Sequence, residues 1–424
     1  MVLCMAIVAL NGCATMKSIQ EKPYLLYTKP LEETIECNRF RLVQAEDVIG
    51  RLASIRLEKG DTLPDIARHF SLGINVISTA NPGVDMWVPH AGQQIVLPLS
   101  FILPDAPRTG IVINVAAMRL FQYKEINQSP VVVTYPVGVG TAERPTPIGQ
   151  MYVERKVMQP TWYVPASISE DHRAKGDPLP AEVPPGPKNP LGEHALYLSK
   201  LTYLIHGTNK PASIGLMATN GCIRLYPEDM KKLYESTPVA TPVCIVNQPY
   251  LIGQRGGVVY LESHGSLDDS NSVEREKVCA KLRALANESA RPLDWSMVYR
   301  VLDEARGIPV PVYEIYQGSS QWVDPAIELK HPAALYGKPE IPELKTAAWY
   351  VLAATLKEEI DAVRMAAIIN HQGPQIPARV LSMSDTYRVI AGPFNDVGDA
   401  KDAAKRLKID LEIDGILMDP VNQK

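Results

Sequence analysis

The chain has 424 residues, which corresponds to about three domains if a domain takes roughly 150 residues. Its 43 Lys and Arg residues against 47 Asp and Glu residues give a formal net charge of −4, and a chain without a cationic excess gives no case for nucleic acid as the main partner. Hydrophobic residues make up 46% of the chain, as in folded proteins. Its 36 prolines are roughly 8% of the residues, against a usual share near 5%. This excess predicts rigid loops and linkers between compact domains.

The amino terminus is apolar and runs into a cysteine. Residues 1–10 read MVLCMAIVAL and are followed by Asn11, Gly12 and Cys13. This pattern resembles the signal of a bacterial lipoprotein, although the basic residues that usually open a signal are missing. The resemblance implies export and lipidation of Cys13. Residues 14–50 are expected to be a linker, in which residues 35–49 fit either a short helix or an extended segment. The alternative is an amino terminus that is buried or frayed. No later stretch holds the about 20 apolar residues of a membrane-spanning helix, so membrane contact is expected only through the lipid anchor.

Residues 51–100 predict a strand, two helices and a second strand. Polar and apolar residues alternate at 54–57, as in a half-buried strand. Apolar side chains then recur at helical spacing at Leu63, Ile66, Ala67 and Phe70. A second short helix fits residues 74–80, and residues 92–98 close the unit as a strand.

This βααβ order resembles the LysM module. The residues that carry the resemblance are Lys59-Gly60-Asp61-Thr62-Leu63, Ile66-Ala67, Ala80-Asn81-Pro82 and Gly92-Gln93-Gln94-Ile95-Val96-Leu97-Pro98. LysM modules bind glycans that contain N-acetylglucosamine, so the resemblance implies binding to peptidoglycan. The alternative is a spacer that no longer binds.

Residues 108–248 predict a β-rich, mainly antiparallel domain. Residues 111–115 and 120–123 fit a hairpin, and residues 131–138 fit a further strand. Six prolines between 178 and 190 exclude a helix there and predict an irregular loop or a mobile lid.

Two segments of this domain hold residues that can form an activated nucleophile. Residues 203–208 (YLIHGT) place His206 at the end of an apolar strand, and Cys222 follows 16 positions later, directly after Gly221. A free thiol has a pKa near 8.5, so only about 3% is thiolate at pH 7. A nearby imidazole can take the proton of Cys222. On residue types alone, the alternative is a Cys and a His that only pack in the core.

The residues around the cysteine fit attack on a carbonyl group. The backbone N–H groups of Gly221 and Cys222 are natural donors to the oxyanion that such an attack forms. Arg224 lies two residues further on, so in an extended segment its side chain points to the same side and can bind a substrate carboxylate.

These segments resemble the catalytic domain of the L,D-transpeptidases of the YkuD type. That family carries His-Gly, about fifteen residues, and then Ser/Thr-X-Gly-Cys-Ile/Val-Arg-Leu/Met. The matching residues are Ile205-His206-Gly207-Thr208 and Thr219-Asn220-Gly221-Cys222-Ile223-Arg224-Leu225, with upstream matches at Val137-Gly138, Thr146-Pro147-Ile148-Gly149 and Asn189-Pro190-Leu191-Gly192. The likeness is nearest to the ErfK-type subgroup, which implies the periplasm of a Gram-negative bacterium.

The resemblance implies a reaction on peptidoglycan. Cys222 attacks the L-centre carbonyl of diaminopimelate in a tetrapeptide stem and releases D-alanine. A second diaminopimelate then gives a 3→3 cross-link, a lysine of an outer-membrane lipoprotein gives attachment to the wall, and water gives trimming. His206 acts as the base, and the carbonyl of Gly207 orients it. Carbapenem-type inhibitors acylate the catalytic thiol of this family.

The remaining site residues come from the same motif. We expect Thr219, Asn220 and Arg224 to contact the substrate. Asn220 departs from many family members, which have a histidine before the Gly-Cys pair, so a second imidazole is missing. No metal is implied, because the sequence has no H-E-x-x-H motif and no C-x-x-C pair. No glycine-rich phosphate loop is present either, and no cofactor is expected.

The carboxyl-terminal part of the chain predicts three further pieces. Residues 249–306 fit a hairpin and two helices, and residues 307–345 are a proline-rich linker. Residues 346–420 follow a β-α-β-β-α-β order that resembles the SPOR domain, whose signature is matched by residues 387–394 (YRVIAGPF). The sheet face of that family binds glycan strands from which the stem peptides have been removed. The alternative is a ferredoxin-like fold that is structural or binds a partner.

The sequence therefore predicts a multidomain, exported wall enzyme with a LysM module, a central YkuD-type domain, a small hairpin and helical appendage, and an α+β SPOR domain. Two other functions stay open. One is an L,D-carboxypeptidase that releases the same thioester to water, and the other is a non-catalytic scaffold that only binds peptidoglycan.

Overall fold

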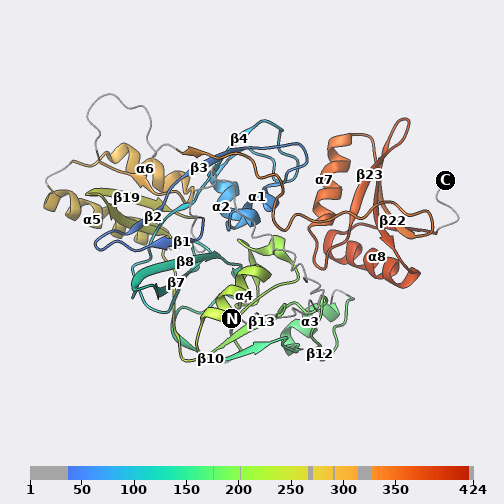
Figure 1. The fold of residues 1–424 in the computed structure, drawn as a ribbon, viewed down its shortest axis with the longest axis horizontal. Coiled ribbons are helices and arrows are strands. Elements are labelled where there is room, and N and C mark those ends of the chain that lie inside the picture. Colours follow the sequence, from blue (N-terminus) through green and yellow to red (C-terminus); the bar gives the residue numbers. More distant parts are fainter. Residues whose placement is uncertain are drawn as a thin grey trace, which may run out of the picture. The chain divides into compact units, whose positions relative to one another are not determined.

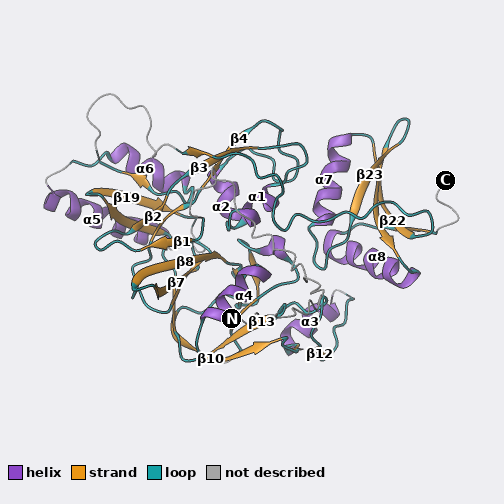
Figure 2. Cartoon of the chain, in the orientation of Figure 1, coloured by secondary structure: helices purple, strands orange, loops and turns teal. Residues whose placement is uncertain are grey.

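A computed structural model describes residues 37–174, 176–200, 202–265, 271–289, 292–313 and 326–419. Figure 1 follows the chain from its blue amino-terminal elements to the red carboxyl-terminal ones, and Figure 2 separates helices from strands. The predicted lipidation site Cys13 lies outside the described residues. Within those residues, no helix has both the length and the apolar character needed to cross a membrane.

The predicted strand–helix–helix–strand order is present in β3 (Ala53–Arg56), α1 (Leu63–His69), α2 (Ile74–Ala80) and β4 (Gln94–Leu97). The Thr62 side chain caps α1 by accepting a hydrogen bond from the Asp65 N–H. Pro64 lies in the first turn, where its missing N–H costs nothing. Asn81 ties the end of α2 to β4, because its amide donates to the carbonyls of Ile77 and Val96 and accepts from the Val96 N–H.

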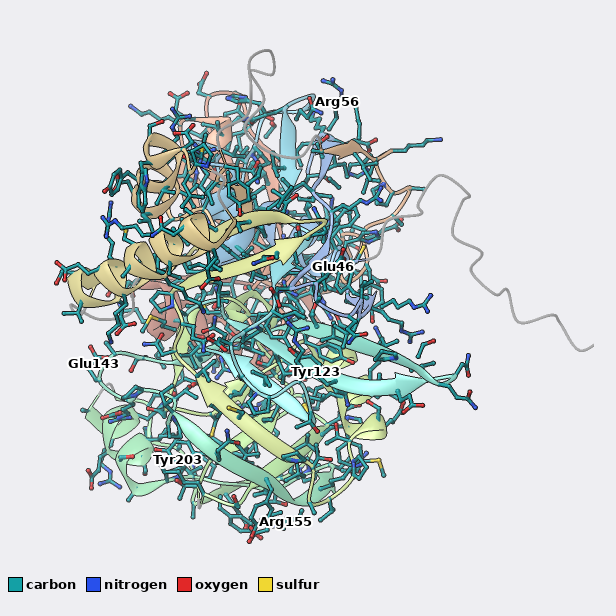
Figure 3. The ribbon with its side chains drawn as sticks, turned by 90° about the vertical axis from the view of Figure 1, so that its left-hand side faces the viewer. Glu46, Arg56, Tyr123, Glu143, Arg155 and Tyr203 are labelled. Carbon is teal, nitrogen blue, oxygen red and sulfur yellow. The ribbon has the colours of Figure 1, made fainter. Side chains whose placement is uncertain are left out.

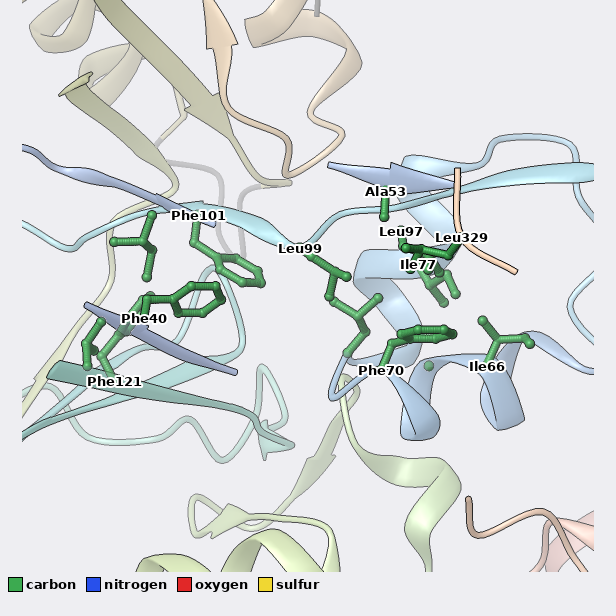
Figure 4. Close-up of a cluster of buried hydrophobic side chains, with 14 of the residues drawn as sticks. Phe40, Ala53, Ile66, Phe70, Ile77, Leu97, Leu99, Phe101, Phe121 and Leu329 are labelled. Carbon is green, nitrogen blue, oxygen red and sulfur yellow. The ribbon is translucent and has the colours of Figure 1, made fainter. Parts of the chain in front are cut away.

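A buried apolar cluster extends from these helices to the large sheet of the next domain. Figure 4 labels Phe40, Ala53, Ile66, Phe70, Ile77, Leu97, Leu99, Phe101, Phe121 and Leu329 among its members. The βααβ unit thus shares its hydrophobic core with the strands that follow it.

Residues 37–50, which we expected to be part of a linker, instead hold two strands. β1 (Arg39–Arg41) pairs antiparallel with β8 (Ser129–Pro136), and β2 (Val48–Gly50) pairs antiparallel with β5 (Ser100–Ile102). Burial of Phe40 in the shared cluster holds β1 in place. Strands of three residues are too short to show a period in the sequence.

The β-rich domain is built on one sheet with the strand order β1-β8-β7-β6-β17-β10-β13-β14-β16. The bounds of the strands not yet given are β6 (Ile111–Asn114), β7 (Arg119–Ile126), β10 (Gly149–Met158), β13 (His194–Leu198), β14 (Leu204–His206), β16 (Ile223–Arg224) and β17 (Pro242–Val246). Neighbouring strands are antiparallel except for β6 with β17 and β14 with β16, which are parallel. The parallel pair places His206 opposite Arg224.

The domain also has elements outside this sheet. They are β9 (Val139–Gly140), β11 (Trp162–Tyr163), α3 (Ala166–Ala174), β12 (Glu182–Val183), the 3₁₀ turn Pro211–Ser213, β15 (Met217–Thr219) and α4 (Pro227–Ser236). The helix α4 begins at Pro227, where proline is favoured, and buries Met230 and Leu233 in the core of the sheet. The proline-rich segment 178–190 contains no helix and contributes only β12 among its regular elements.

The appendage consists of the hairpin β18 (Tyr250–Arg255) and β19 (Val258–Ser263), the helices α5 (Asn271–Ser289) and α6 (Trp295–Glu304), and β20 (Val310–Pro311). The expected linker 307–345 is partly built into its neighbours. β20 pairs with β19, and β21 (Ile327–Glu328) pairs parallel with β3. Leu329 is buried in the shared cluster, which helps to hold this segment beside the βααβ unit.

The last unit has the predicted β-α-β-β-α-β order. Its elements are β22 (Trp349–Leu356), α7 (Glu359–Asn370), β23 (Ala378–Ser382), β24 (Tyr387–Phe394), α8 (Val397–Leu411) and β25 (Ile416–Met418). The sheet order is β23-β24-β22-β25, with antiparallel pairing throughout. Asp396 caps α8 by accepting from the Asp399 N–H.

Replacing the buried Asn81 tests how the βααβ unit is held together. We expect Asn81→Ala to destabilise the unit by about 2–4 kcal/mol, because it removes three hydrogen bonds and leaves the Val96 groups without partners. Hydrogen exchange of residues 53–97 in the full chain measures this loss. Asn75→Ala is the matched control, since the buried Asn75 Oδ1 has no hydrogen-bond partner among the described residues. Equal protection in the two variants would contradict the interpretation.

Candidate active site

His206 lies at the end of β14, between β13 and β16. Its side chain is buried, and its Nδ1 is 2.6 Å from the carbonyl oxygen of Gly207. Because a carbonyl only accepts, Nδ1 of the neutral ring carries the proton and Nε2 carries the lone pair. The geometry therefore sets the tautomer of His206 and makes Nε2 its basic nitrogen.

The surroundings of His206 keep its ring neutral. Burial, joined by the nearby charge of Arg224, lowers the pKa of His206 to about 3. Backbone hydrogen bonds at Gly207 and Leu191 oppose this shift only in part. At neutral pH the imidazole is thus a base that can accept a proton.

The turn before Cys222 is held by Thr219 and Gly221. The Thr219 hydroxyl accepts from the Gly221 N–H at 3.2 Å and donates to the Cys222 carbonyl at 2.6 Å. Gly221 has a positive φ of +99°, and a Cβ there would lie 2.7 Å from a ring carbon of Tyr203. Glycine is required at this position both for its backbone conformation and for space.

These hydrogen bonds change one expectation about the oxyanion. The sequence suggested that the N–H groups of Gly221 and Cys222 both face it, but the Gly221 N–H is already bonded to Thr219. Among the described residues, the Cys222 N–H has no such acceptor, and it remains available to a developing negative charge. The spacing of the motif alone does not reveal that the Thr219 hydroxyl, two residues before Gly221, accepts this N–H.

Cys222 is a half-buried thiol in its resting, protonated form. Burial raises the pKa of Cys222 above its usual value, while a backbone hydrogen bond at Leu204 and the charge of Arg224 lower it in part. The sulfur lies 3.7 Å from the carbonyl oxygen of Thr202, to which the thiol donates. Within the described structure no hydrogen bond joins Cys222 to His206, so the thiol must turn from Thr202 before it can give up its proton.

Arg224 follows Cys222 in the extended strand β16. Its Nη1 donates to the Ser213 hydroxyl at 2.9 Å, and its buried Nε has no hydrogen-bond partner in the part of the chain that the structure describes. Burial lowers the pKa of Arg224, and the neighbouring Cys222 opposes that shift. The guanidinium is therefore close enough to stabilise a thiolate at Cys222 and retains a donor for a bound anion.

Asn220 is exposed and belongs to a contact that the sequence did not reveal. Its Oδ1 accepts from Arg144 at 2.5 Å, and Arg144 also pairs with Asp171 of α3 at 2.7 Å. Arg144 thus connects the cysteine turn to α3. The three residues are far apart in the chain, and no short motif contains them.

The predicted site residues line a single cleft of about 850 Å³. His206, Thr219, Asn220, Cys222 and Arg224 all contribute to its wall. Gly207 and Gly221 act through their backbones. The other wall includes residues outside the motifs, namely Glu143, Arg144, Arg155, Trp162, Tyr163, Ile168, Tyr197 and Tyr203.

Three residues of the cleft wall, Glu143, Arg155 and Tyr203, are labelled in Figure 3. In the described part of the chain, no group of three or more His, Cys, Asp or Glu residues is placed to hold a metal ion. A neutral base, a thiol and a cation in one cleft define a thiol-dependent acyl-transfer enzyme.

Comparison with known proteins identifies the family. Residues 108–245 match the L,D-transpeptidase catalytic domain of the YkuD type, and residues 345–418 match the SPOR domain. The probable L,D-transpeptidase YbiS of Escherichia coli is 40% identical over 229 residues, which are 53% of this chain and 74% of that protein. The probable L,D-transpeptidase ErfK/SrfK of Escherichia coli is 37% identical over 285 residues, 65% of this chain and 89% of that protein.

Among solved structures, the catalytic domain of the Enterococcus faecium L,D-transpeptidase is 22% identical, with 34% of this chain and 99% of that domain covered and a TM-score of 0.26. The chain belongs to the L,D-transpeptidase family, and its expected enzymatic activity is confirmed. The expected SPOR domain is also confirmed.

The pKa shifts predict how the reactivity of Cys222 depends on pH. We expect alkylation of Cys222 by iodoacetamide to accelerate continuously between pH 7 and 9, because the raised pKa of the thiol leaves little thiolate at neutral pH. Arg224→Ala removes a charge that lowers this pKa, so it should slow alkylation at pH 8 by about fivefold or more.

Peptide mass spectrometry of the full chain measures alkylation at Cys222 separately from the other cysteines. Arg39→Ala, at the opposite edge of the sheet, is the control. A rate step near pH 6–7 would show that His206 titrates there and would contradict a neutral imidazole with a pKa of about 3.

Proposed function

We propose that this L,D-transpeptidase acts on diaminopimelate in a tetrapeptide stem of peptidoglycan. The neutral His206 takes the proton of the Cys222 thiol on Nε2, and the thiolate attacks the L-centre carbonyl. The C–N bond to D-alanine breaks, the proton passes from His206 to the leaving amine, and a thioester remains on Cys222. The observation that carries this proposal is the Nδ1 contact with Gly207, which leaves Nε2 as the basic nitrogen in the cleft.

Two groups support the tetrahedral intermediate. The Cys222 N–H is free to donate to its oxyanion, and loss of one such donor typically costs about 10²- to 10³-fold in rate. The charge of Arg224 stabilises the thiolate before attack. Thr219 keeps the turn closed around the nucleophile, so we assign it a positioning role beside its place in the cleft wall.

The second half of the reaction transfers the acyl group to an amine. His206 takes a proton from the incoming amine, whose nitrogen bonds to the carbonyl carbon. The C–S bond then breaks, and the proton returns from His206 to the Cys222 thiolate. The amine of a second diaminopimelate gives a 3→3 cross-link, and a lysine of an outer-membrane lipoprotein gives attachment to the wall. Water in the same position gives an L,D-carboxypeptidase.

Acylation by a carbapenem tests the nucleophile. We expect the full-length wild-type chain to gain the mass of one carbapenem, and Cys222→Ala to gain none, because the β-lactam carbonyl is attacked by the same thiolate. Intact-protein mass spectrometry measures the adduct. Cys244→Ala is the control, since the buried Cys244 lies on β17 and is outside the cleft wall.

A folded wild-type chain without an adduct would contradict the proposed chemistry and would favour the non-catalytic scaffold. Solved relatives of this family include a complex with imipenem and a domain acylated by ertapenem.

We further propose that the βααβ unit at 51–100 is a LysM module and that it and the SPOR domain bind glycan strands. Tethering to a polymer raises the local concentration of substrate without new catalytic contacts. For the SPOR domain, strand alternation puts Arg379 and Arg388 on the same sheet face as Ile390, opposite the face that α7 and α8 cover.

These arginines suit glycan from which stem peptides have been removed, because that removal frees the carboxylate of each lactyl group. Arg379 Nε and Nη2 are buried and have no hydrogen-bond partner among the described residues, so this guanidinium has N–H groups that lack an acceptor. Guanidinium groups bind carboxylates through paired hydrogen bonds.

Co-sedimentation with peptide-free glycan tests the role of these arginines. We expect the full chain with Arg379→Ala and Arg388→Ala to be retained about tenfold less than wild type, because two charge-assisted contacts are lost. Lys408→Ala, an exposed cation on α8, is the control. Equal retention of the double variant and the control would contradict binding on this sheet face.

We propose that the enzyme works in the periplasm of a Gram-negative bacterium, a location that suits its wall substrate. We propose that Cys13 is lipidated there and anchors the chain to a membrane. The support is the sequence pattern at residues 1–13.

A further inference from the structure

Three arginines line the active-site cleft, and their surroundings differ. Arg144 is paired with Asp171 and Asn220. Arg224 lies beside Cys222 and donates to Ser213. Arg155 is exposed and forms no ion pair with a carboxylate of the described residues. Its charge is therefore available to a ligand in the cleft.

The Arg155 side chain is held by an aromatic ring. Arg155 on β10 is directly opposite Tyr197 on β13, and the guanidinium carbon lies 3.4 Å from the centre of the Tyr197 ring. Stacking on a ring face fixes the plane of a guanidinium while its N–H edge stays free. A stacked arginine loses less side-chain entropy when it binds a planar anion than a freely moving one does.

Arg155 is set apart from His206 in the sheet, because β13 lies between β10, which carries Arg155, and β14, which carries His206. The wall of the cleft also includes Trp162 and the exposed Tyr163. Aromatic groups next to a cation suit a ligand that has both methylene groups and a carboxylate.

We propose that Arg155 is a specificity-determining residue that binds a carboxylate of a peptidoglycan stem peptide through a two-pronged hydrogen bond. This inference rests on the proposed function, since it assumes a stem peptide in the cleft. Diaminopimelate carries a carboxylate at its D-centre, separated by methylene groups from the L-centre that reacts. Both the donor and the acceptor stem supply this chemistry.

The neighbouring residue Lys156 provides a matched control on the same strand. Successive side chains of a strand point to opposite faces, and Lys156 contacts the Tyr234 carbonyl at 2.5 Å and lies over the Tyr234 ring at 4.4 Å. It is absent from the cleft wall. Lys156→Ala thus removes a cation and its contact with a tyrosine without changing the proposed subsite.

The first experiment compares stem tetrapeptides in which one carboxylate at a time is amidated. We expect the full-length wild-type chain to form its acyl-enzyme about 10- to 100-fold faster with the free acid than with one of the amides. Arg155→Ala should abolish this preference by slowing only the reaction of the acid. Arg155→Lys should retain part of it, and Lys156→Ala all of it. Quenched-flow mass spectrometry measures the acyl-enzyme.

The same series of peptides, used as acceptors, distinguishes the two sources of the carboxylate. If Arg155→Ala loses the preference for the free acid in acyl-enzyme formation, Arg155 binds the donor stem. If Arg155→Ala forms the acyl-enzyme normally and loses the preference only in the transfer to the amine, Arg155 binds the acceptor stem. Alkylation of Cys222 by the uncharged iodoacetamide should be equal in wild type and Arg155→Ala, whereas a general structural defect would slow it as well.

Two outcomes overturn the inference. In the first, Arg155→Ala and Lys156→Ala prefer the free acid over the amide by the same factor, both in acyl-enzyme formation and in transfer to the amine. The other is an equal loss with acid, amide and iodoacetamide. If wild type forms no acyl-enzyme, the proposed function fails instead. In that case calorimetric binding of the acid and amide peptides to the full-length Cys222→Ala chain, with and without Arg155→Ala, still decides whether Arg155 binds the carboxylate.

Discussion

The hydrogen bond between His206 Nδ1 and the Gly207 carbonyl is the contact on which the active site depends. It sets the tautomer of a buried ring and leaves Nε2 as the basic nitrogen. Burial keeps this ring neutral, with a pKa of about 3, so it can accept a proton at neutral pH. The same burial raises the pKa of Cys222. In the proposed mechanism the thiol is therefore activated by His206 and Arg224 during the reaction, without a preformed ion pair.

The sheet brings these groups together through one parallel strand pair. Because β14 and β16 run in the same direction, their register sets His206 opposite Arg224, and Cys222 lies just before β16. The turn that carries Cys222 is closed by Thr219 and passes so near Tyr203 that only glycine fits at position 221. The chemistry thus relies on backbone geometry as much as on the side chains that react.

The βααβ unit packs against the catalytic domain, and the ligand that we propose for the outer modules is the same polymer on which the enzyme acts. The apolar cluster that contains Phe70 and Phe121 joins the βααβ unit to the large sheet. The SPOR domain presents arginines on the sheet face opposite its helices, and the catalytic cleft presents Arg155 on its wall. Peptidoglycan is a polymer with many carboxylates, so cations on separate modules can bind the same kind of ligand.

Local patterns in the sequence were sufficient to predict the element order of the outer modules and the family of the catalytic domain. Helical and alternating spacing indicated the element order of both outer modules, and the motifs around His206 and Cys222 indicated the family. Three features are visible only in the folded chain: residues 37–50 hold strands, the Gly221 N–H donates to Thr219, and Arg155 stacks on Tyr197. These features depend on strand register, turn geometry and burial between distant segments, which no local period or spacing records.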